Sequence, residues 1–278
     1  MNSKYNKNIK TLGPRAAHLT TTLYEQKRPI FRLKDVQRIL NLDQRSSSNF
    51  IRTLVDRGLV TRLKPGLFIL VPPELGKERE YVGNPFVLAR EIVDGQGYYL
   101  SHGTAMEIHG MLTQPQLVVY VTTLKPRKPL RVRGVDFRFI HSQKKFFFGL
   151  TDHWATKQER VRISDLERTV IDGLRQPEYC GGLTEVAKGL WMREQEISTS
   201  RLIMYAVTMG KGAVIRRLGY ILELYEIGAP EDWELLRLDL TDTYVQLDPL
   251  LPPDGKFLRR WRLQLNVTPE ELLSVVRT

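Results

Sequence analysis

Residues 44–71 have the sequence QRSSSNFIRTLVDRGLVTRLKPGLFILV, a polar amphipathic segment followed by two short apolar runs. At about 100° per residue, one side of a helix over residues 44–57 is mostly apolar and is expected to be buried. That side comprises Ser47, Phe50, Ile51, Leu54 and Val55. Gly58 is a typical residue just beyond a helix C-terminus. Pro65-Gly66 separates apolar runs at residues 59–63 and 67–71, which predicts a β-hairpin.

Two further helices are predicted upstream of this segment. Residues 16–27 have an amphipathic pattern that Pro29 ends, and residues 33–40 have a second one. Residues 30–32, between them, are expected to be extended. Helix, helix, turn, helix and hairpin is the order of a winged helix-turn-helix, and we predict such a DNA-binding domain over residues 15–73.

The remainder of the chain predicts a second, larger domain. Residues 1–14 are expected to be a flexible arm, and residues 81–278 mix strands and helices, with a helical C-terminal part, so the predicted fold class is α+β. Strands are predicted at residues 117–124, 130–133, 135–141 and 159–163, with a closing pair at residues 243–247 and 256–266. Helices are predicted at residues 85–93, 102–109, 183–196, 199–209, 212–227 and 231–237, with a last one from Thr268. Ser164 and Glu167 resemble a capping box, and the helix that it starts is expected to bury Leu166, Val170, Ile171 and Leu174.

The charge of the chain is concentrated near its N-terminus. The sequence has 278 residues with 42 Lys and Arg against 31 Asp and Glu, a net charge of +11. Residues 1–64 hold 14 basic and 4 acidic side chains, so they carry a net +10 and the remainder carries +1. A basic surplus favours nucleic acid or an anionic membrane as partner, and its position in the predicted winged domain favours double-stranded DNA.

The helix over residues 44–57 is the candidate for base recognition. Arginine can donate two hydrogen bonds to guanine, asparagine can pair with adenine, and serine can bond base edges or phosphate. Base contacts come mainly from the N-terminal half of such a helix, which disfavours Asp56. The predicted base-contacting residues are Arg45, Ser46, Ser48, Asn49 and Arg52.

Other basic residues are expected to neutralise phosphates and to supply most of the affinity. The candidates are Arg15, Lys34, Arg38, Arg62 and Lys64, with Lys27, Arg28 and Arg32 if they face the same side. A second basic patch lies between predicted strands and comprises Lys125, Arg127, Lys128, Arg131 and Arg133. This patch fits DNA backbone, RNA or a partner protein as well as a solvated loop.

Signatures of enzymes and cofactor sites are absent from the sequence. It contains no G-x-x-x-x-G-K-[ST], G-x-G-x-x-G or H-E-x-x-H motif, so we predict no catalytic residue, cofactor or metal. His102 and His109 are expected to be structural. Asp165, Glu167 and Asp172 are expected to cap helices or to lie on their solvent-exposed sides. The single cysteine, the polar N-terminus and the lack of a long apolar stretch predict a cytoplasmic protein that does not bind membranes.

Two other functions remain open at this point. A nuclease-like enzyme, targeted to nucleic acid by its winged helix, would need converging carboxylates, for which Asp136, Asp152 and Glu159 are the candidates. Alternatively, the winged helix could dock a protein, although the concentrated positive charge argues against this.

Several segments, taken in order, resemble the AbiEi-like family, the antitoxin and transcriptional regulator of type IV toxin–antitoxin systems. They are YYLSHGTAMEIHG at residues 98–110, VVYVTT at 118–123, GVDFRF at 134–139, FFG at 147–149, VRISDLERTVID at 161–172 and GGL at 181–183. With the N-terminal domain, the resemblance covers about residues 15–195. Leu166 stands where the family pattern has proline.

The resemblance implies a protein with two tasks. The winged helix would bind inverted repeats in its own promoter and repress transcription, and the C-terminal domain would counteract a nucleotidyltransferase toxin without forming a stable complex with it. In this sequence the motif residues are expected to have structural roles, with Ser101 and Ser164 as helix caps, Gly110 at a helix end, and Phe147 and Phe148 in the core, so no catalytic residue is carried over from the family.

Overall fold

The structure is a computed structural model that describes residues 12–238 and 240–274. The described chain forms two compact units, in which helices and sheets occur together, and this confirms the predicted α+β class. The first unit contains the described part of Met1–Gln96 with Leu130–Val135 and Trp154–Arg160; the second contains Gly97–Pro129, Asp136–His153 and the described part of Val161–Thr278. The predicted domain boundary at residues 74–80 falls within the first unit, and residues 1–11 of the predicted arm lie outside the described residues.

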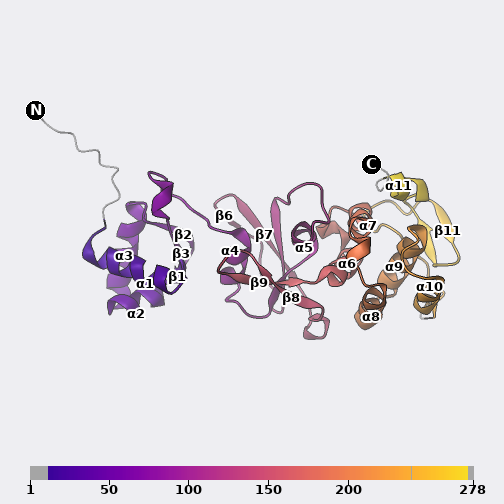
Figure 1. Ribbon diagram of the computed structural model, residues 1–278, viewed down its shortest axis with the longest axis horizontal. Coiled ribbons are helices and arrows are strands. Elements are labelled where there is room, and N and C mark those ends of the chain that lie inside the picture. Colours follow the sequence, from indigo (N-terminus) through magenta and orange to yellow (C-terminus); the bar gives the residue numbers. More distant parts are fainter. Residues whose placement is uncertain (1–11, 239, 275–278) are drawn as a thin grey trace, which may run out of the picture. The chain divides into compact units, whose positions relative to one another are not determined.

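The N-terminal part of the first unit consists of three helices and a small antiparallel sheet (Figure 1). Its elements are α1 (Pro14–Glu25), β1 (Ile30–Arg32), α2 (Leu33–Leu40), α3 (Gln44–Asp56), β2 (Val60–Lys64) and β3 (Leu67–Leu70). The strand order is β1-β3-β2, with antiparallel pairing throughout. We call this part the three-helix module. Each of its elements was predicted from the sequence within two residues at either end.

Local residues explain where these elements begin and end. The Asp43 carboxylate accepts a hydrogen bond from the Ser46 N–H at 2.9 Å and so caps α3. Gly66 has a φ of +76°, a conformation that a hairpin turn requires and that glycine adopts without strain. Side chains from all three helices and from the sheet fill one core, which includes Leu19, Leu23, Phe31, Val36, Ile51, Leu54 and Phe68.

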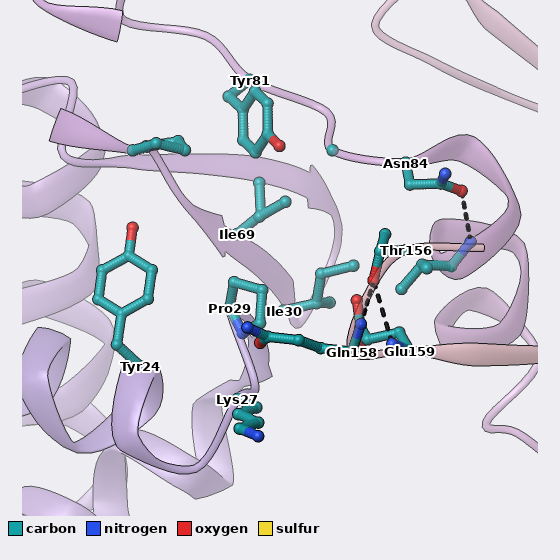
Figure 2. Close-up of a pocket in the computed structure, with 13 residues that line it drawn as sticks. Tyr24, Lys27, Pro29, Ile30, Ile69, Tyr81, Asn84, Thr156, Gln158 and Glu159 are labelled. Carbon is teal, nitrogen blue, oxygen red and sulfur yellow. Dashed lines mark hydrogen bonds between the residues drawn. The ribbon is translucent and has the colours of Figure 1, made fainter. Parts of the chain in front are cut away.

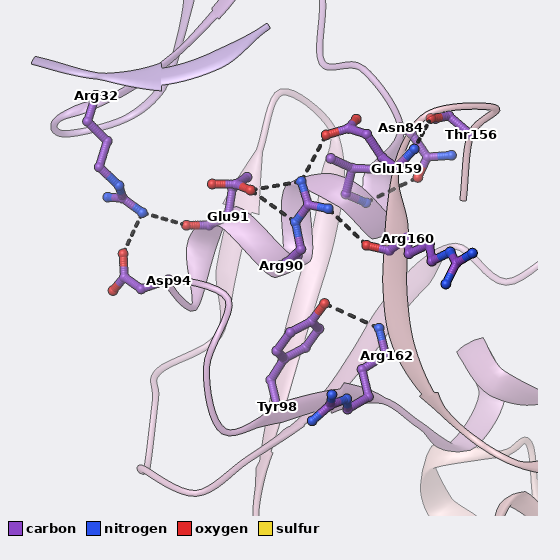
Figure 3. Close-up of polar contacts among 11 residues, drawn as sticks. Arg32, Asn84, Arg90, Glu91, Asp94, Tyr98, Thr156, Glu159, Arg160 and Arg162 are labelled. Atoms are coloured by element: carbon purple, nitrogen blue, oxygen red, sulfur yellow. Dashed lines mark hydrogen bonds and ion pairs between the residues drawn. The ribbon is translucent and has the colours of Figure 1, made fainter. Parts of the chain in front are cut away.

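The first unit also contains helix α4 (Pro85–Ile92), the short helix η1 (Pro73–Leu75) and strand β6 (Leu130–Val132). Asn84 caps α4 by accepting a hydrogen bond from the Phe86 N–H, and its side-chain amide donates to the Ala155 carbonyl at 2.9 Å. Arg90 of α4 binds the Glu159 carboxylate and the Arg160 carbonyl, both at 2.8 Å (Figure 3). These bonds attach the loop at residues 154–160 to α4.

The largest sheet has the strand order β6-β7-β5-β4-β9-β8. Besides β6, its strands are β4 (Tyr98–Leu100), β5 (Val118–Thr123), β7 (Val135–His141), β8 (Leu150–Trp154) and β9 (Arg160–Ser164). Strand β5 pairs antiparallel with β4 and parallel with β7. Strands β4 and β8 had not been predicted.

The C-terminal part of the second unit is mostly helical (Figure 1). The helices of the second unit are α5 (His102–Ile108), α6 (Leu166–Arg175), α7 (Leu183–Met192), α8 (Thr199–Met209), α9 (Gly212–Leu224), α10 (Pro230–Arg237) and α11 (Pro269–Ser274), with short helices η2 (Lys144–Phe146), η3 (Pro177–Tyr179) and η4 (Glu194–Glu196); α5 and η2 lie between strands of the large sheet in the sequence. The closing strand pair is in fact a three-stranded sheet of β10 (Val245–Gln246), β12 (Leu263–Leu265) and β11 (Lys256–Leu258). Trp261 is fully buried against Gly219, where any side chain would collide with the indole ring.

Some roles expected for the motif residues are wrong. The cap of α6 is Asp165, which accepts from the Arg168 N–H at 2.8 Å, whereas the Ser164 hydroxyl bonds to Thr169. Ser101 stands at the start of α5 without capping it, because its hydroxyl is bonded to Thr122 and His102. Gly110 ends α5 with a φ of +65°, as expected. Phe147 and Phe148 are half-buried, with Phe148 packed against the core, and the buried residue of that run is Phe146.

Candidate nucleic-acid interface

Helix α3 has one buried side and one exposed side. Ser47, Ile51 and Leu54 are buried. Arg45, Ser48, Asn49 and Arg52 are exposed. The predicted base-contacting residues therefore share a surface, except for Ser46, which is half-buried.

The polar side chains of this surface fall into two groups. The Ser46 hydroxyl donates to the Asp43 carboxylate at 2.7 Å, and the Ser48 hydroxyl donates to the Gln44 carbonyl at 2.8 Å, so both serines are engaged within the first turns of the helix. The side chains of Arg45, Asn49 and Arg52 make no hydrogen bond or ion pair with any described residue. Their donors and acceptors are thus available to a ligand.

A groove of about 500 Å³ lies between α3 and the β2–β3 hairpin. Arg52 of α3 and Arg62 of β2 both line it, and its apolar floor includes Leu33 and Phe68. Arg62 is exposed on an otherwise largely buried strand, so its guanidinium extends toward solvent. The groove therefore brings a cation of the hairpin close to the exposed surface of α3.

The other predicted phosphate contacts differ in their surroundings. Arg15 of α1 and Lys34 of α2 are exposed, and Arg38 of α2 is exposed with its guanidinium 3.4 Å from the Asp35 carboxylate. Arg28 lies 3.8 Å from the same carboxylate. Asp35 therefore neutralises part of the positive charge beside α2.

Lys64, which was predicted to bind phosphate, is bonded within the protein. Its ammonium group donates to the Ile92 carbonyl of α4 at 3.0 Å. Arg32 acts similarly, since its guanidinium donates to the Glu91 carbonyl at 2.8 Å and to the Asp94 carboxylate (Figure 3). Because the last carbonyls of a helix carry partial negative charge, two cations here stabilise the C-terminus of α4.

The second basic patch is divided between the two units. Lys125 and Lys128 are exposed and Arg127 is half-buried in the second unit. Arg131 and Arg133 are exposed in the first unit, where Arg133 forms an ion pair with Glu80 at 2.5 Å. Part of the charge of this patch is therefore already neutralised.

The carboxylates considered for a nuclease do not converge. Asp136 is on β7 and Asp152 is on β8, with β5, β4 and β9 between them, a separation of about 19 Å at ordinary strand spacing. Glu159 is bound to Arg90. These three side chains cannot bind one metal ion. In residues 12–238 and 240–274, no group of three or more His, Cys, Asp and Glu side chains is placed to bind a metal.

A buried polar cluster in the second unit was not predicted from the sequence. Arg168 of α6 is completely buried and donates to the Asp172 carboxylate at 2.9 Å and to the Tyr99 hydroxyl at 3.1 Å. Its guanidinium also stacks over Phe148, 4.2 Å from the ring centre. The i,i+4 spacing of Arg168 and Asp172 is a signal of pairing, although it does not indicate burial. Glu167 is buried too and accepts from the Ser198 N–H, so the prediction of a capping or solvated role is wrong for Glu167 and Asp172, whereas Asp165 caps α6 as expected.

Both histidines expected to be structural are hydrogen-bonded. His102 is buried, with Nδ1 2.9 Å from the Ser101 hydroxyl, and His109 Nε2 lies 2.8 Å from the Ser164 carbonyl. Burial lowers the pKa of His102 to about 4, so its ring is neutral at pH 7. Among the described helices, none is long and apolar enough to cross a bilayer.

The fold and the surface together define a mixed α+β protein whose first unit presents an exposed helix with two arginines and an asparagine. No family model matches the chain, and no curated protein matches it either. The crystal structure of the RV2827C protein from Mycobacterium tuberculosis is similar, with a TM-score of 0.69 over 98% of this chain and 97% of that chain. The two sequences are 16% identical, so the similarity establishes a shared fold alone.

Proposed function

We propose that this protein is a cytoplasmic, sequence-specific DNA-binding repressor whose residues 15–73 act as a winged helix-turn-helix. The observation that carries this proposal is the exposed surface of α3, where Arg45, Asn49 and Arg52 have no described intramolecular partner. A helix with a buried apolar side and such an outer side has the dimensions and the chemistry to enter a major groove.

The residues divide into two roles. Arg45, Asn49 and Arg52 contact base edges, because their planar groups can form paired hydrogen bonds with guanine or adenine. Arg15, Lys34, Arg38 and Arg62 bind phosphates and give the complex its affinity and its salt dependence. Ser46 and Ser48 hold the first turn of α3 in shape.

A titration with two duplexes tests this proposal. One duplex carries the region upstream of the protein's own gene, and the other has the same composition in shuffled order. We expect the native duplex to bind at least about 10³-fold more tightly at physiological salt, which is the lower end for specific complexes. Equal affinity for both duplexes would refute the proposed sequence specificity.

We further propose that the protein is the antitoxin of a type IV toxin–antitoxin system. This part is supported by the ordered motifs between residues 98 and 183 and their resemblance to the AbiEi-like family. Coexpression with a nucleotidyltransferase encoded beside it should restore growth, while the two proteins should not copurify. Unchanged growth inhibition would contradict the antitoxin role and leave the DNA-binding proposal unaffected.

A further inference from the structure

The first unit contains a second cavity, of about 260 Å³, that shares no lining residue with the groove beside α3 (Figure 2). Its walls come from the end of α1, from β1 and β3, from the segment before α4, and from the loop at residues 154–160. The volume is below the roughly 300–1,000 Å³ of pockets for drug-sized molecules, so any ligand must be small.

The inner surface of this cavity is apolar and aromatic. Ile30, Ile69 and Val87 line it and are buried. Tyr24 and Tyr81 also line it (Figure 2). Such a combination favours a flat apolar ring, which packs on branched aliphatic groups and on aromatic faces.

The polar groups of the cavity leave one positive charge uncompensated. The Glu159 carboxylate lines the cavity but is bound to Arg90 at 2.8 Å, so its charge is neutralised. Lys27 also lines it and is exposed, with no ion pair to any described residue. Burial, with Glu74 and Tyr81, raises the pKa of Tyr24, so its hydroxyl remains a hydrogen-bond donor at neutral pH. An ammonium group without an ion pair suits an anionic oxygen ligand.

We propose that this cavity binds a small aromatic carboxylate, with its ring against Ile69 and Val87 and its carboxylate at Lys27. In a DNA-binding regulator such a site would bind an effector, and that role rests on the proposed function. The binding itself does not, because the cavity is formed without DNA and can be tested on the free protein.

Calorimetry with the full-length protein tests the site directly. The probes are benzoate, salicylate and indole-3-acetate, and benzamide serves as the neutral counterpart of benzoate. We expect at least one carboxylate to bind once per chain with a Kd below about 1 mM, as befits a ligand of this size, and benzoate to bind more tightly than benzamide. No saturable binding by any of the three carboxylates would overturn the proposal.

Two substitutions locate the binding. Lys27→Ala should weaken carboxylate binding about threefold to tenfold while leaving benzamide unaffected, as expected for a partly exposed charge contact. Tyr81→Ala should weaken both, and it should fold, because the segment is held by the Tyr81 N–H bond to the Thr61 hydroxyl at 2.9 Å. Lys157→Ala is the matched control, since Lys157 is an exposed lysine of the loop at residues 154–160 and does not line the cavity. Equal losses in Lys27→Ala and Lys157→Ala would place the carboxylate elsewhere and contradict the proposal.

Discussion

Helices α3 and α6 start in the same way and differ in what surrounds their arginines. Each is capped by an aspartate that accepts a hydrogen bond from the backbone N–H three residues later. In α3, Arg45 and Arg52 are exposed and have no described partner. In α6, Arg168 is completely buried and is bound to Asp172 and Tyr99.

The difference shows that an arginine on a helix acquires its role from its surroundings. A buried guanidinium must be paired, because an isolated charge in the interior is very costly, so Arg168 holds its own unit together. An exposed guanidinium contributes little to stability and retains its donors for a partner. Substitutions in α6 should therefore change folding, and substitutions in α3 should change binding.

The largest expected effect is on stability. The substitution Arg168→Met should lower the free energy of unfolding by about 3–5 kcal/mol, because it leaves the Asp172 carboxylate buried without its cation. Arg52→Met is the matched control on α3 and should change it by less than about 0.5 kcal/mol. Chemical denaturation followed by circular dichroism measures both. Similar losses of stability in the two variants would contradict the difference that we infer between α6 and α3.

The next effect concerns the pH dependence of stability, to which the buried His102 contributes. Burial lowers the pKa of His102 to about 4 from 6.5, and the nearby Arg168 and Arg175 lower it while Asp172 raises it. Because the unfolded chain binds this proton more readily, the contribution of neutral His102 is fully present above pH 6.5 and is lost as the pH falls toward 4. The total loss is about 3 kcal/mol.

His102→Asn tests this effect, because asparagine tolerates the left-handed backbone of this residue and does not titrate. Denaturation at several pH values between 7 and 4 should show that the variant loses less stability on acidification than the unmodified protein. Parallel curves for the two proteins would mean that His102 contributes nothing to acid sensitivity.

A smaller effect separates two cations of the hairpin. Arg62→Ala should reduce the slope of log affinity against log salt by about one, because the variant lacks one proposed phosphate contact. Lys64→Ala should leave that slope unchanged, because the Lys64 ammonium group is bonded to the Ile92 carbonyl. The Lys64→Ala variant should instead have a free energy of unfolding about 1 kcal/mol lower. If both variants reduced the slope equally, Lys64 would have to leave α4 when DNA binds.

The three-helix module could be predicted because its signals are local. Pro29, Gly58 and Pro65-Gly66 mark the ends of elements, and the apolar side of α3 has a clear helical period. The exposed surface with Arg45, Asn49 and Arg52 followed from the same period. Its use in DNA recognition stays a prediction.

The remaining features depend on residues far apart in the sequence. Strand β4 has only three residues, all buried, and is specified by its pairing with β5 and β9. Arg168 belongs to a helix whose polar residues were expected to face solvent. Its partner Tyr99 lies 69 residues away in the sequence. Lys64 meets the end of a helix 28 residues further on. Short-range periodicity carries no information about such partners.

The most direct test of the account is the DNA affinity of the double variant Arg45→Ala/Arg52→Ala. Fluorescence anisotropy would compare it with the unmodified protein on the native upstream duplex and on the shuffled duplex. We predict a loss of about 10²–10⁴-fold on the native duplex, from two paired base contacts, and less than about tenfold on the shuffled one. An equal loss on both duplexes would contradict base recognition by α3.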